Sequence, residues 1–478
     1  MTTAGAERRA MGVAGGATRR RVMGIAGTGA AGLLLAACGG STGPGGSSAA
    51  PAQFKEVVTL DFAHRWEGVR EPLIQQQIES FAKIQPNIKV SAQQLFCSTG
   101  ENCIGGMDYG KITTQMAAGT PPDLFMVQSP FAADYAARGS LMNLNDLAKR
   151  DKLELPKTFY PALVTMGTYK GNVIGLPQLS AGDTPYLFMS TQAFQEAGMD
   201  VNKPPTTWED LVSMAQRLSK RGGGAGGFDR IGMDFPTNPF IHYAAKNNVK
   251  ILSDDATKVT FNTPEGVDTL QWMANTAQQL YGQNQNRAAF MTAAAAQGTG
   301  GGRAPYYTNK VGMWNSGVWH FFEIKAEKEI HNPGFQYNVA LLPHNAKNAQ
   351  AKLNSLADVV WLYSVPNSSK KADAAFEFLK HVTMGEGNRI FVKAQNRPSP
   401  ALKINEDPDF SKDNPHWNTT IKKALEIMTP LPQTPAWAKV SAALTKMQND
   451  ALNGTSAPRE AIAEAARDAQ LAIDELKR

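Results

Sequence analysis

The feature that most constrains the fold is an alternation of strand-type and helix-type segments at the start of the globular region. Residues 57–63, VVTLDFA, form a short apolar run typical of a strand. The next apolar residues share one face of a helix that Pro72 begins and Pro86 ends, namely Leu73, Ile74, Ile78, Phe81 and Ile84. Residues 88–92, IKVSA, predict a second strand. Because this alternation builds a parallel sheet covered by helices on both faces, the predicted class is α/β.

Later segments continue the same pattern. PDLFMVQS, residues 122–129, predicts another strand that ends in polar residues. Helices are predicted over residues 369–382 and from Pro458 to the C-terminus. Glycine-rich stretches at 222–227 and 298–302 predict loops, and we find no internal repeat.

The first 53 residues have the character of an export signal and a tether. A twin-arginine pattern, TRRRVM at 18–23, precedes a modestly apolar run that ends at Ala37, so residues 1–37 are predicted to be a signal. LAAC, residues 35–38, resembles the bacterial lipobox, in which the cysteine thiol takes the lipid. Residues 38–53 have linker composition. We expect an exported chain that Cys38 anchors in membrane lipid, at the outer face of the cell membrane or in the periplasm.

Charge and hydropathy exclude several classes of function. The formal net charge is +6, but five arginines and one glutamate in the signal supply +4 of it and leave +2 for residues 38–478. This small excess gives no reason to expect nucleic-acid binding. No segment after the signal contains 18 consecutive apolar residues, so no further membrane span is expected. We expect a globular monomer with two or three lobes.

The remaining two cysteines enclose a short turn. Cys97 and Cys103 flank STGEN, which favours turns, and an exported protein meets conditions in which disulfides persist. A zinc site needs more ligands than one glutamate and two thiols, and the spacing is not that of a Cys-x-x-Cys redox pair. The sequence therefore predicts a Cys97–Cys103 disulfide and no metal or cofactor.

Seven segments, in order, resemble the extracellular solute-binding proteins of ABC importers, in particular the carbohydrate-binding group called family 1, of lipoprotein type. They are FAKIQPNIKV (81–90), AAGTPPDLFMV (117–127), ARGSLMNLNDL (137–147), YKGNVIGLP (169–177), LFMSTQAFQEAGMDVNKPPTTWEDL (187–211), TNKVGMWNSGVWH (308–320) and VPNSSKKADAAFEFLKHV (365–382). Ile174 stands where that family usually has an aromatic residue.

The resemblance implies two α/β lobes of the periplasmic-binding-protein type II fold, joined by crossing strands. The N-lobe would comprise residues 54–174 and 355–395, and the C-lobe residues 180–353 and 398–478. A ligand would bind between the lobes and close them like a hinged trap. It also implies a membrane permease as partner and no catalytic activity.

Candidate ligand residues come from strand ends and from the resemblance. Loops beyond the carboxyl ends of strands meet ligands in such sheets. Sugars stack their C–H faces on aromatic rings and bond their hydroxyls to planar polar groups. The predicted ligand-binding residues are Trp66, Glu67, Gln128, Ser129, Asp183, Tyr186, Trp314, Asn315, Trp319, Asp358 and Arg397. His64, Arg65 and Ser316 lie in the same stretches.

Each candidate has a structural alternative. Trp319 matches the family's Gly-x-Trp tryptophan, which often stacks on sugar, but core packing would also explain it. Asp358 and Trp361 stand where the family often has two glycines, so side chains could replace a backbone contact there. Trp208, beside the N-cap-like Thr207, and Asp123, at a strand entry, are predicted to be structural.

The sequence is compatible with other classes of function. A receptor for another polar solute, a glycerol phosphate-type ester or a peptide, is the main alternative, and Arg65, Ser129 and Arg397 could hold a phosphate. A glycosidase needs only two placed carboxylates. However, the chain lacks the His-Glu-x-x-His pattern of metalloproteases. A surface adhesin is the third class.

Overall fold

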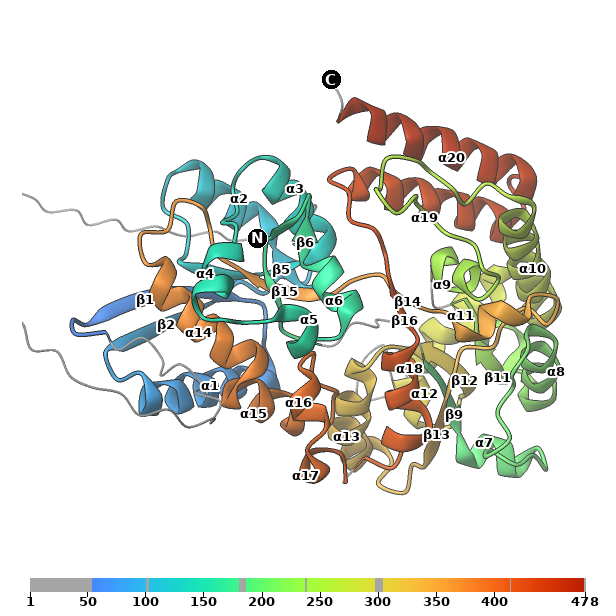
Figure 1. Ribbon diagram of the computed structural model, residues 1–478. Coiled ribbons are helices and arrows are strands. Elements are labelled where there is room, and N and C mark those ends of the chain that lie inside the picture. Colours follow the sequence, from blue (N-terminus) through green and yellow to red (C-terminus); the bar gives the residue numbers. More distant parts are fainter. Residues whose placement is uncertain are drawn as a thin grey trace, which may run out of the picture. The chain divides into compact units, whose positions relative to one another are not determined.

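The computed structural model describes residues 54–99, 103–179, 186–236, 239–296, 304–412 and 414–476. The predicted signal, Cys38, the linker and Asp183 lie outside these ranges. The described residues contain two five-stranded sheets, each flanked by helices (Figure 1). This arrangement confirms the predicted α/β class.

The first sheet has the strand order β2-β1-β5-β15-β8. Its strands are β2 (Ile88–Gln94), β1 (Val58–His64), β5 (Leu124–Gln128), β15 (Trp361–Ser364) and β8 (Leu176–Pro177). β1 pairs in parallel with β2 and β5, whereas β15 runs antiparallel to both of its neighbours. All residues of β5 are buried, as expected for a strand inside a sheet that helices cover.

Helices distant in sequence cover this first sheet. α1 (Glu71–Ile84) packs against α14 (Ala372–Met384) and α15 (Glu386–Ala394), and Figure 1 shows the orange α14 and α15 beside the blue α1. α3 (Ser129–Ala137) contacts β5 and β15. The chain therefore leaves this sheet after β8 and returns to it more than 180 residues later.

The second sheet has the order β10-β11-β12-β9-β13. Its strands are β10 (Lys220–Arg221), β11 (Phe228–Asp234), β12 (Val311–Ser316), β9 (Tyr186–Ser190) and β13 (Tyr337–Leu341). β11 and β12 are parallel, and β9 runs antiparallel between β12 and β13. α8 (Trp208–Leu218) packs on β11 and β12, and α10 (Pro264–Tyr281) packs against α19 (Trp437–Asn453) and α20 (Pro458–Glu475).

Short elements connect these layers. The short strands are β3 (Cys103–Ile104), β4 (Met107–Asp108), β6 (Thr168–Tyr169), β7 (Asn172–Val173), β14 (Ser355–Ala357) and β16 (Met428–Pro430). The other α-helices are α2 (Tyr109–Ala117), α4 (Asn145–Arg150), α5 (Leu155–Thr158), α6 (Pro161–Met166), α7 (Thr191–Glu196), α9 (Phe240–Ala245), α11 (Asn284–Ala296), α12 (Ala304–Tyr307), α13 (Trp319–His331), α16 (Leu402–Asn405), α17 (Pro408–Ser411) and α18 (Lys422–Glu426). A π-helical turn, Trp417–Ile421, leads into α18.

Local sequence explains why α8 begins where it does. The Thr207 side chain accepts a hydrogen bond from the Asp210 backbone N–H, and Asp210 in turn accepts from the Thr207 N–H. This reciprocal capping box satisfies two N–H groups at the start of the helix. Trp208 follows it and stacks on Trp272, with ring centroids 4.1 Å apart.

The predicted disulfide is present between Cys97 and Cys103, whose Cα atoms are 5.7 Å apart. Within the described part of the chain, no helix is both long enough and apolar enough to cross a bilayer. The same residues contain no cluster of three His, Cys, Asp or Glu side chains suited to a metal ion.

Candidate ligand-binding site

A small cavity collects residues from the ends of both sheets. Its volume is about 290 Å³, and its lining residues are Arg65, Trp66, Arg70, Gly105, Gln128, Leu179, Val318, Trp319, Glu323, Val359, Trp361 and Arg397. Arg65 and Trp66 follow β1, Gln128 ends β5, and Trp319 begins α13 just after β12. The cavity thus lies beyond the carboxyl ends of these strands, where α/β sheets bind ligands.

Hydrogen bonds between side chains and backbone atoms hold two of the lining residues. The Trp66 carbonyl accepts from Gln94 Nε2 at 2.8 Å, and the Gln128 N–H donates to the Tyr109 hydroxyl at 2.8 Å. Trp361 lies directly opposite Gln128 in the β5–β15 register. These contacts place an indole and a carboxamide side by side at one edge of the first sheet.

Two arginines pack on the aromatic rings of the cavity. The guanidinium carbon of Arg65 lies 4.9 Å from the centre of the Trp66 ring and 5.3 Å from that of Trp361. Arg70 lies 5.8 Å from Trp66 and 4.7 Å from Phe322 of α13. Cation–π contacts of this length hold a guanidinium by its face, whereas its hydrogen bonds form at its edge.

Arg70 also connects residues that belong to the two sheets. Its Nε donates to Gln395 Oε1 at 3.1 Å, and its Nη2 lies 3.5 Å from Glu323 Oε1 of α13. Both side chains of the ion pair are mostly buried, at 14% and 18% exposed. The loop after β1 and the helix after β12 therefore share a polar contact at the cavity wall.

The tryptophans of the cavity differ in exposure. Trp66 is 2% exposed and Trp361 is 7% exposed, whereas Trp319 is partly exposed. Since Arg65 occupies a face of both buried rings, Trp319 is the indole best placed to offer a free face to a ligand. His64, next to Arg65, is buried, and this burial lowers its pKa to about 4. It is therefore neutral at pH 7 and adds no positive charge.

Four of the predicted ligand residues meet at this cavity: Trp66, Gln128, Trp319 and Arg397. Asp183 lies outside the described residues. Glu67 is exposed and does not line the cavity. Ser129 is buried, where its hydroxyl accepts from the Val360 N–H at 3.3 Å.

The other predicted ligand residues are buried away from this lining. Tyr186 lies inside β9 and packs on Phe321, and burial raises the pKa of its hydroxyl. Trp314 donates its indole N–H to His320 Nε2 at 3.0 Å. Asn315 donates to the Tyr243 hydroxyl.

Asp358 also makes a structural contact, because its Oδ2 lies 3.2 Å from His242 Nε2. Its neighbours Val359 and Trp361 line the cavity in its place.

The prediction omitted several lining residues, of which Arg70, Gly105 and Glu323 make the polar and close contacts. Arg70 lies in the same loop as Trp66, so the strand-end rule could have found it. Nothing in the sequence marks Gly105 or Glu323, because each reaches the cavity through a tertiary contact.

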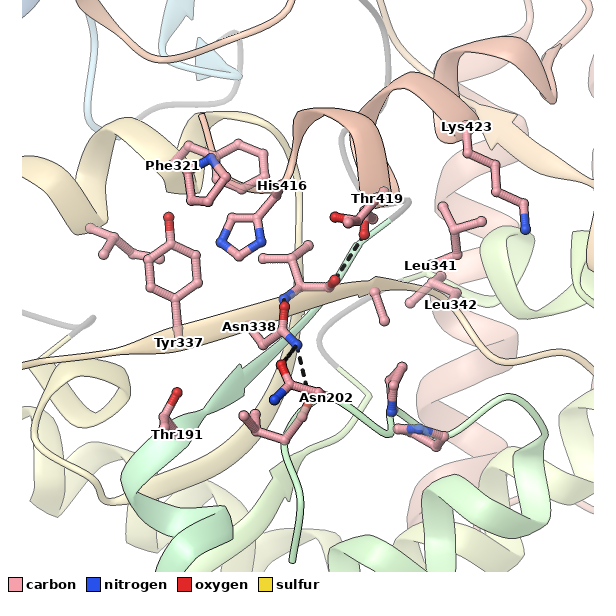
Figure 2. A pocket seen from close by; sticks show the side chains of 18 of the residues that line it. Thr191, Asn202, Phe321, Tyr337, Asn338, Leu341, Leu342, His416, Thr419 and Lys423 are labelled. Carbon is pink, nitrogen blue, oxygen red and sulfur yellow. Dashed lines mark hydrogen bonds between the residues drawn. The ribbon is translucent and has the colours of Figure 1, made fainter. Parts of the chain in front are cut away.

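A second and larger cavity, about 1230 Å³, follows the outer edge of β13 (Figure 2). Figure 2 shows the rings of Phe321, Tyr337 and His416 grouped at one end and Lys423 at the other. It lies along the side of a strand rather than beyond strand ends. The smaller cavity, in contrast, lies beyond strand ends, where α/β sheets bind ligands.

A family model for bacterial extracellular solute-binding proteins matches residues 67–385. The chain belongs to this family. Curated relatives of this solute-binding protein include an uncharacterized ABC transporter extracellular-binding protein of Pyrococcus horikoshii, 24% identical over 38% of this chain and 39% of that protein. Another is an sn-glycerol-3-phosphate-binding periplasmic protein of Shigella dysenteriae, 26% identical over 44% of this chain and 48% of that protein. The matches thus span less than two thirds of these relatives.

Solved structures resemble this solute-binding protein over most of its length. An ABC substrate-binding protein of Listeria monocytogenes, in complex with cycloalternan, has a TM-score of 0.68 at 21% identity and covers 88% of this chain and 99% of its own. The maltose/maltodextrin-binding domain of Bdellovibrio bacteriovorus, bound to maltotriose, has a TM-score of 0.65 at 20% identity. The match covers 87% of this chain and 99% of that domain. This solute-binding protein therefore has the two-lobed fold of these proteins.

Proposed function

We propose that this solute-binding protein captures a sugar or oligosaccharide in the 290 Å³ cavity and delivers it to the membrane permease of an ABC importer. The observation that carries the proposal is the partly exposed Trp319 beside Gln128 and Arg397. An indole face suits the C–H face of a sugar ring, and amide and guanidinium groups suit its hydroxyls. Structural neighbours were solved with cycloalternan, mannotriose and maltotriose, which favours the same ligand class.

A second candidate ligand is a glycerol phosphate-type ester. Arg65, Arg70 and Arg397 line the cavity, and guanidinium groups bind phosphate oxygens in pairs. The Shigella relative is named for sn-glycerol 3-phosphate. A peptide remains the third ligand class to be tested.

Ligand-induced thermal stabilisation distinguishes these ligands. The panel comprises tagatose, maltotriose, mannotriose, sn-glycerol 3-phosphate, a glycerol phosphodiester and a tripeptide. A rise in melting temperature with a saccharide, confirmed by calorimetry, is the expected result. A rise with a phosphate ester or peptide and none with any saccharide would contradict the carbohydrate proposal.

Trp319 provides the matched variants for this assay. Trp319→Ala should abolish the shift, whereas Trp319→Phe should retain part of it because a smaller ring still stacks. Equal loss in both variants would argue against stacking.

We further propose that the chain is exported through its twin-arginine signal, cleaved before Cys38 and anchored by lipid on that cysteine. The expected result of Cys38→Ser is loss of labelling by a radioactive fatty acid and release from the membrane fraction. Retention of both in the variant would contradict the anchor.

A further inference from the structure

The disulfide closes a hairpin that forms part of the ligand cavity. Cys103 begins β3 and pairs with Asp108 of β4, and the turn between these strands is Gly105–Gly106. The Cys97 N–H donates to the Gly106 carbonyl at 3.3 Å. The disulfide and this hydrogen bond together tie the hairpin to the segment that follows β2.

The turn presses on three side chains that line the cavity. A Cβ atom on Gly105 would lie 2.5 Å from Gln128 Nε2 and 3.0 Å from the Trp361 ring. One on Gly106 would lie 3.0 Å from Arg65 Nη2. The φ angles are +58° and +80°, in the region that favours glycine. Both space and backbone conformation therefore require glycine at this contact.

Arg65 is thus enclosed by three groups. The rings of Trp66 and Trp361 hold its guanidinium at 4.9 and 5.3 Å, and the Gly106 backbone approaches its Nη2. Trp361 belongs to β15 of the first sheet and Trp66 follows β1, but the turn belongs to a two-stranded hairpin with few residues of its own. The disulfide, the Cys97–Gly106 hydrogen bond and a 3.0 Å hydrogen bond from the Asp108 N–H to the Leu95 carbonyl attach this hairpin to the segment after β2.

We propose that the Cys97–Cys103 disulfide positions Arg65 for ligand binding by holding the Gly105–Gly106 turn against its guanidinium. Cys97 and Cys103 are positioning residues that touch no ligand themselves. The stabilisation from loop closure grows with the length of the closed loop, and this loop separates its cysteines by only six positions. The contribution of this disulfide to global stability is therefore smaller than that of a bridge that closes a long loop. The role in ligand binding rests on the function proposed above.

The direct test observes Arg65 without any ligand. The exported protein is labelled with ¹⁵N-arginine, and the side-chain Nε–Hε resonance of Arg65 is assigned by its absence in Arg65→Lys. Ring currents from two indoles displace this resonance. In Cys97→Ala/Cys103→Ala, it should move toward the position of an exposed arginine such as Arg138. An unchanged Arg65 resonance in the folded double variant would overturn the proposal.

Matched glycine variants separate the cavity contact from backbone strain. Gly119 has φ +72°, and no atom lies within 4 Å of the position that a Cβ would take there, so Gly119→Ala strains the backbone in open space. Gly106→Ala should move the Arg65 resonance, because the added methyl would lie 3.0 Å from Arg65 Nη2. It should also weaken maltotriose binding about tenfold, the cost of one disturbed charge-assisted hydrogen bond. Gly119→Ala should change neither. Equal effects of the two variants would overturn the proposal.

The same measurements keep the two proposals apart. If no saccharide binds the native protein but the Arg65 resonance responds to loss of the disulfide, the carbohydrate function fails and the positioning role stands. If maltotriose binds equally well with and without the disulfide, the positioning role fails and the carbohydrate function stands.

Discussion

Asp123 collects three hydrogen-bond donors from two separate parts of the chain. Its carboxylate accepts from the Asp61 N–H at 2.9 Å, from Ser369 Oγ at 3.2 Å and from Lys371 Nζ at 2.9 Å. The structural role predicted for it agrees with these contacts. The carboxylate connects β1 to the turn before α14. Its loss therefore affects both the first sheet and the helix layer beside it.

Asp123→Ala should lower the free energy of unfolding by about 2 kcal/mol, because a partly buried lysine and a backbone N–H lose an ionised partner. Urea unfolding measures this change. Asp146→Ala, at an exposed position, is the control and should change stability by less than about 0.5 kcal/mol. Similar losses in the two variants would show that the Asp123 contacts add little.

His381 makes stability depend on pH. Its ring is 5% exposed and contacts Ser80 Oγ at 2.7 Å, and burial lowers its pKa to about 4. In the unfolded chain the pKa returns to about 6.5, so between these values the unfolded state alone binds the proton. The free energy of unfolding should therefore fall as the pH drops from 6.5 toward 4.

Each such histidine contributes a slope of about 1.4 kcal/mol per pH unit in this window. His381→Gln should reduce the total slope between pH 4 and 6.5 by that amount. Above pH 7.5 the free energy of unfolding should have the same pH dependence in the variant as in the native protein. Urea unfolding at several pH values measures both. An unaltered slope in the variant would mean that His381 is protonated in the folded state.

The residues of the site show what sequence alone can and cannot predict. Trp66 and Gln128 follow readable strands, so the strand-end rule predicted their place at the cavity. Asp358 joins them in the prediction through the family resemblance, yet it pairs with His242, 116 positions away. Whether such a side chain faces a cavity or a partner depends on a tertiary contact that local sequence does not encode.

At the scale of elements, β13 shows how an edge strand is protected. The Val339 N–H donates to Asn338 Oδ1 at 2.8 Å, and its carbonyl accepts from Thr420 Oγ1 at 2.9 Å. Both backbone groups therefore point away from β9. Asn338 also bonds the loop at Asn202, as Figure 2 shows. The middle of the edge is thereby closed to pairing with another chain.

Thr420→Val should expose this edge, because valine keeps the shape of threonine but removes the donor to the Val339 carbonyl. We expect a loss of about 1–2 kcal/mol in unfolding free energy and faster aggregation on mild heating, followed by light scattering. The neighbouring Thr419→Val is the control, since Thr419 is exposed. Equal aggregation of both variants would exclude edge protection by Thr420.

Element prediction succeeded where the local pattern was strong. The strand predicted at 57–63 is β1 at 58–64, and the helix predicted at 369–382 is α14 at 372–384. The capping residues at Thr207 were readable too. The hairpin of β3 and β4 was not predicted, because two-residue strands give no periodic signal and depend on a covalent link to a neighbouring segment.

At the scale of the whole molecule, ligand binding should stabilise the fold through mass action. A ligand present at 100 times its dissociation constant raises the free energy of unfolding by about 2.7 kcal/mol if it binds only the folded state. Chemical unfolding with and without maltotriose measures this gain. The gain should vanish in Trp319→Ala when each protein is compared with its own unliganded state.

A control for that experiment is a ligand titration in the native protein. The stabilisation should grow with the logarithm of ligand concentration, as linkage requires. A gain that is independent of concentration, or that persists in Trp319→Ala, would point to a nonspecific solvent effect.

The route of the chain through the first sheet has a consequence for biosynthesis. β15 is the inner strand between β5 and β8, but it lies at Trp361–Ser364, after every strand of the second sheet. During synthesis, the second sheet thus has all its strands before the ribosome has made the strand that completes the first. The sheet whose strands begin first is therefore the one completed last. Until β15 has been made, one edge of β5 is unpaired. Any factor that binds the nascent chain to prevent aggregation must cover this edge.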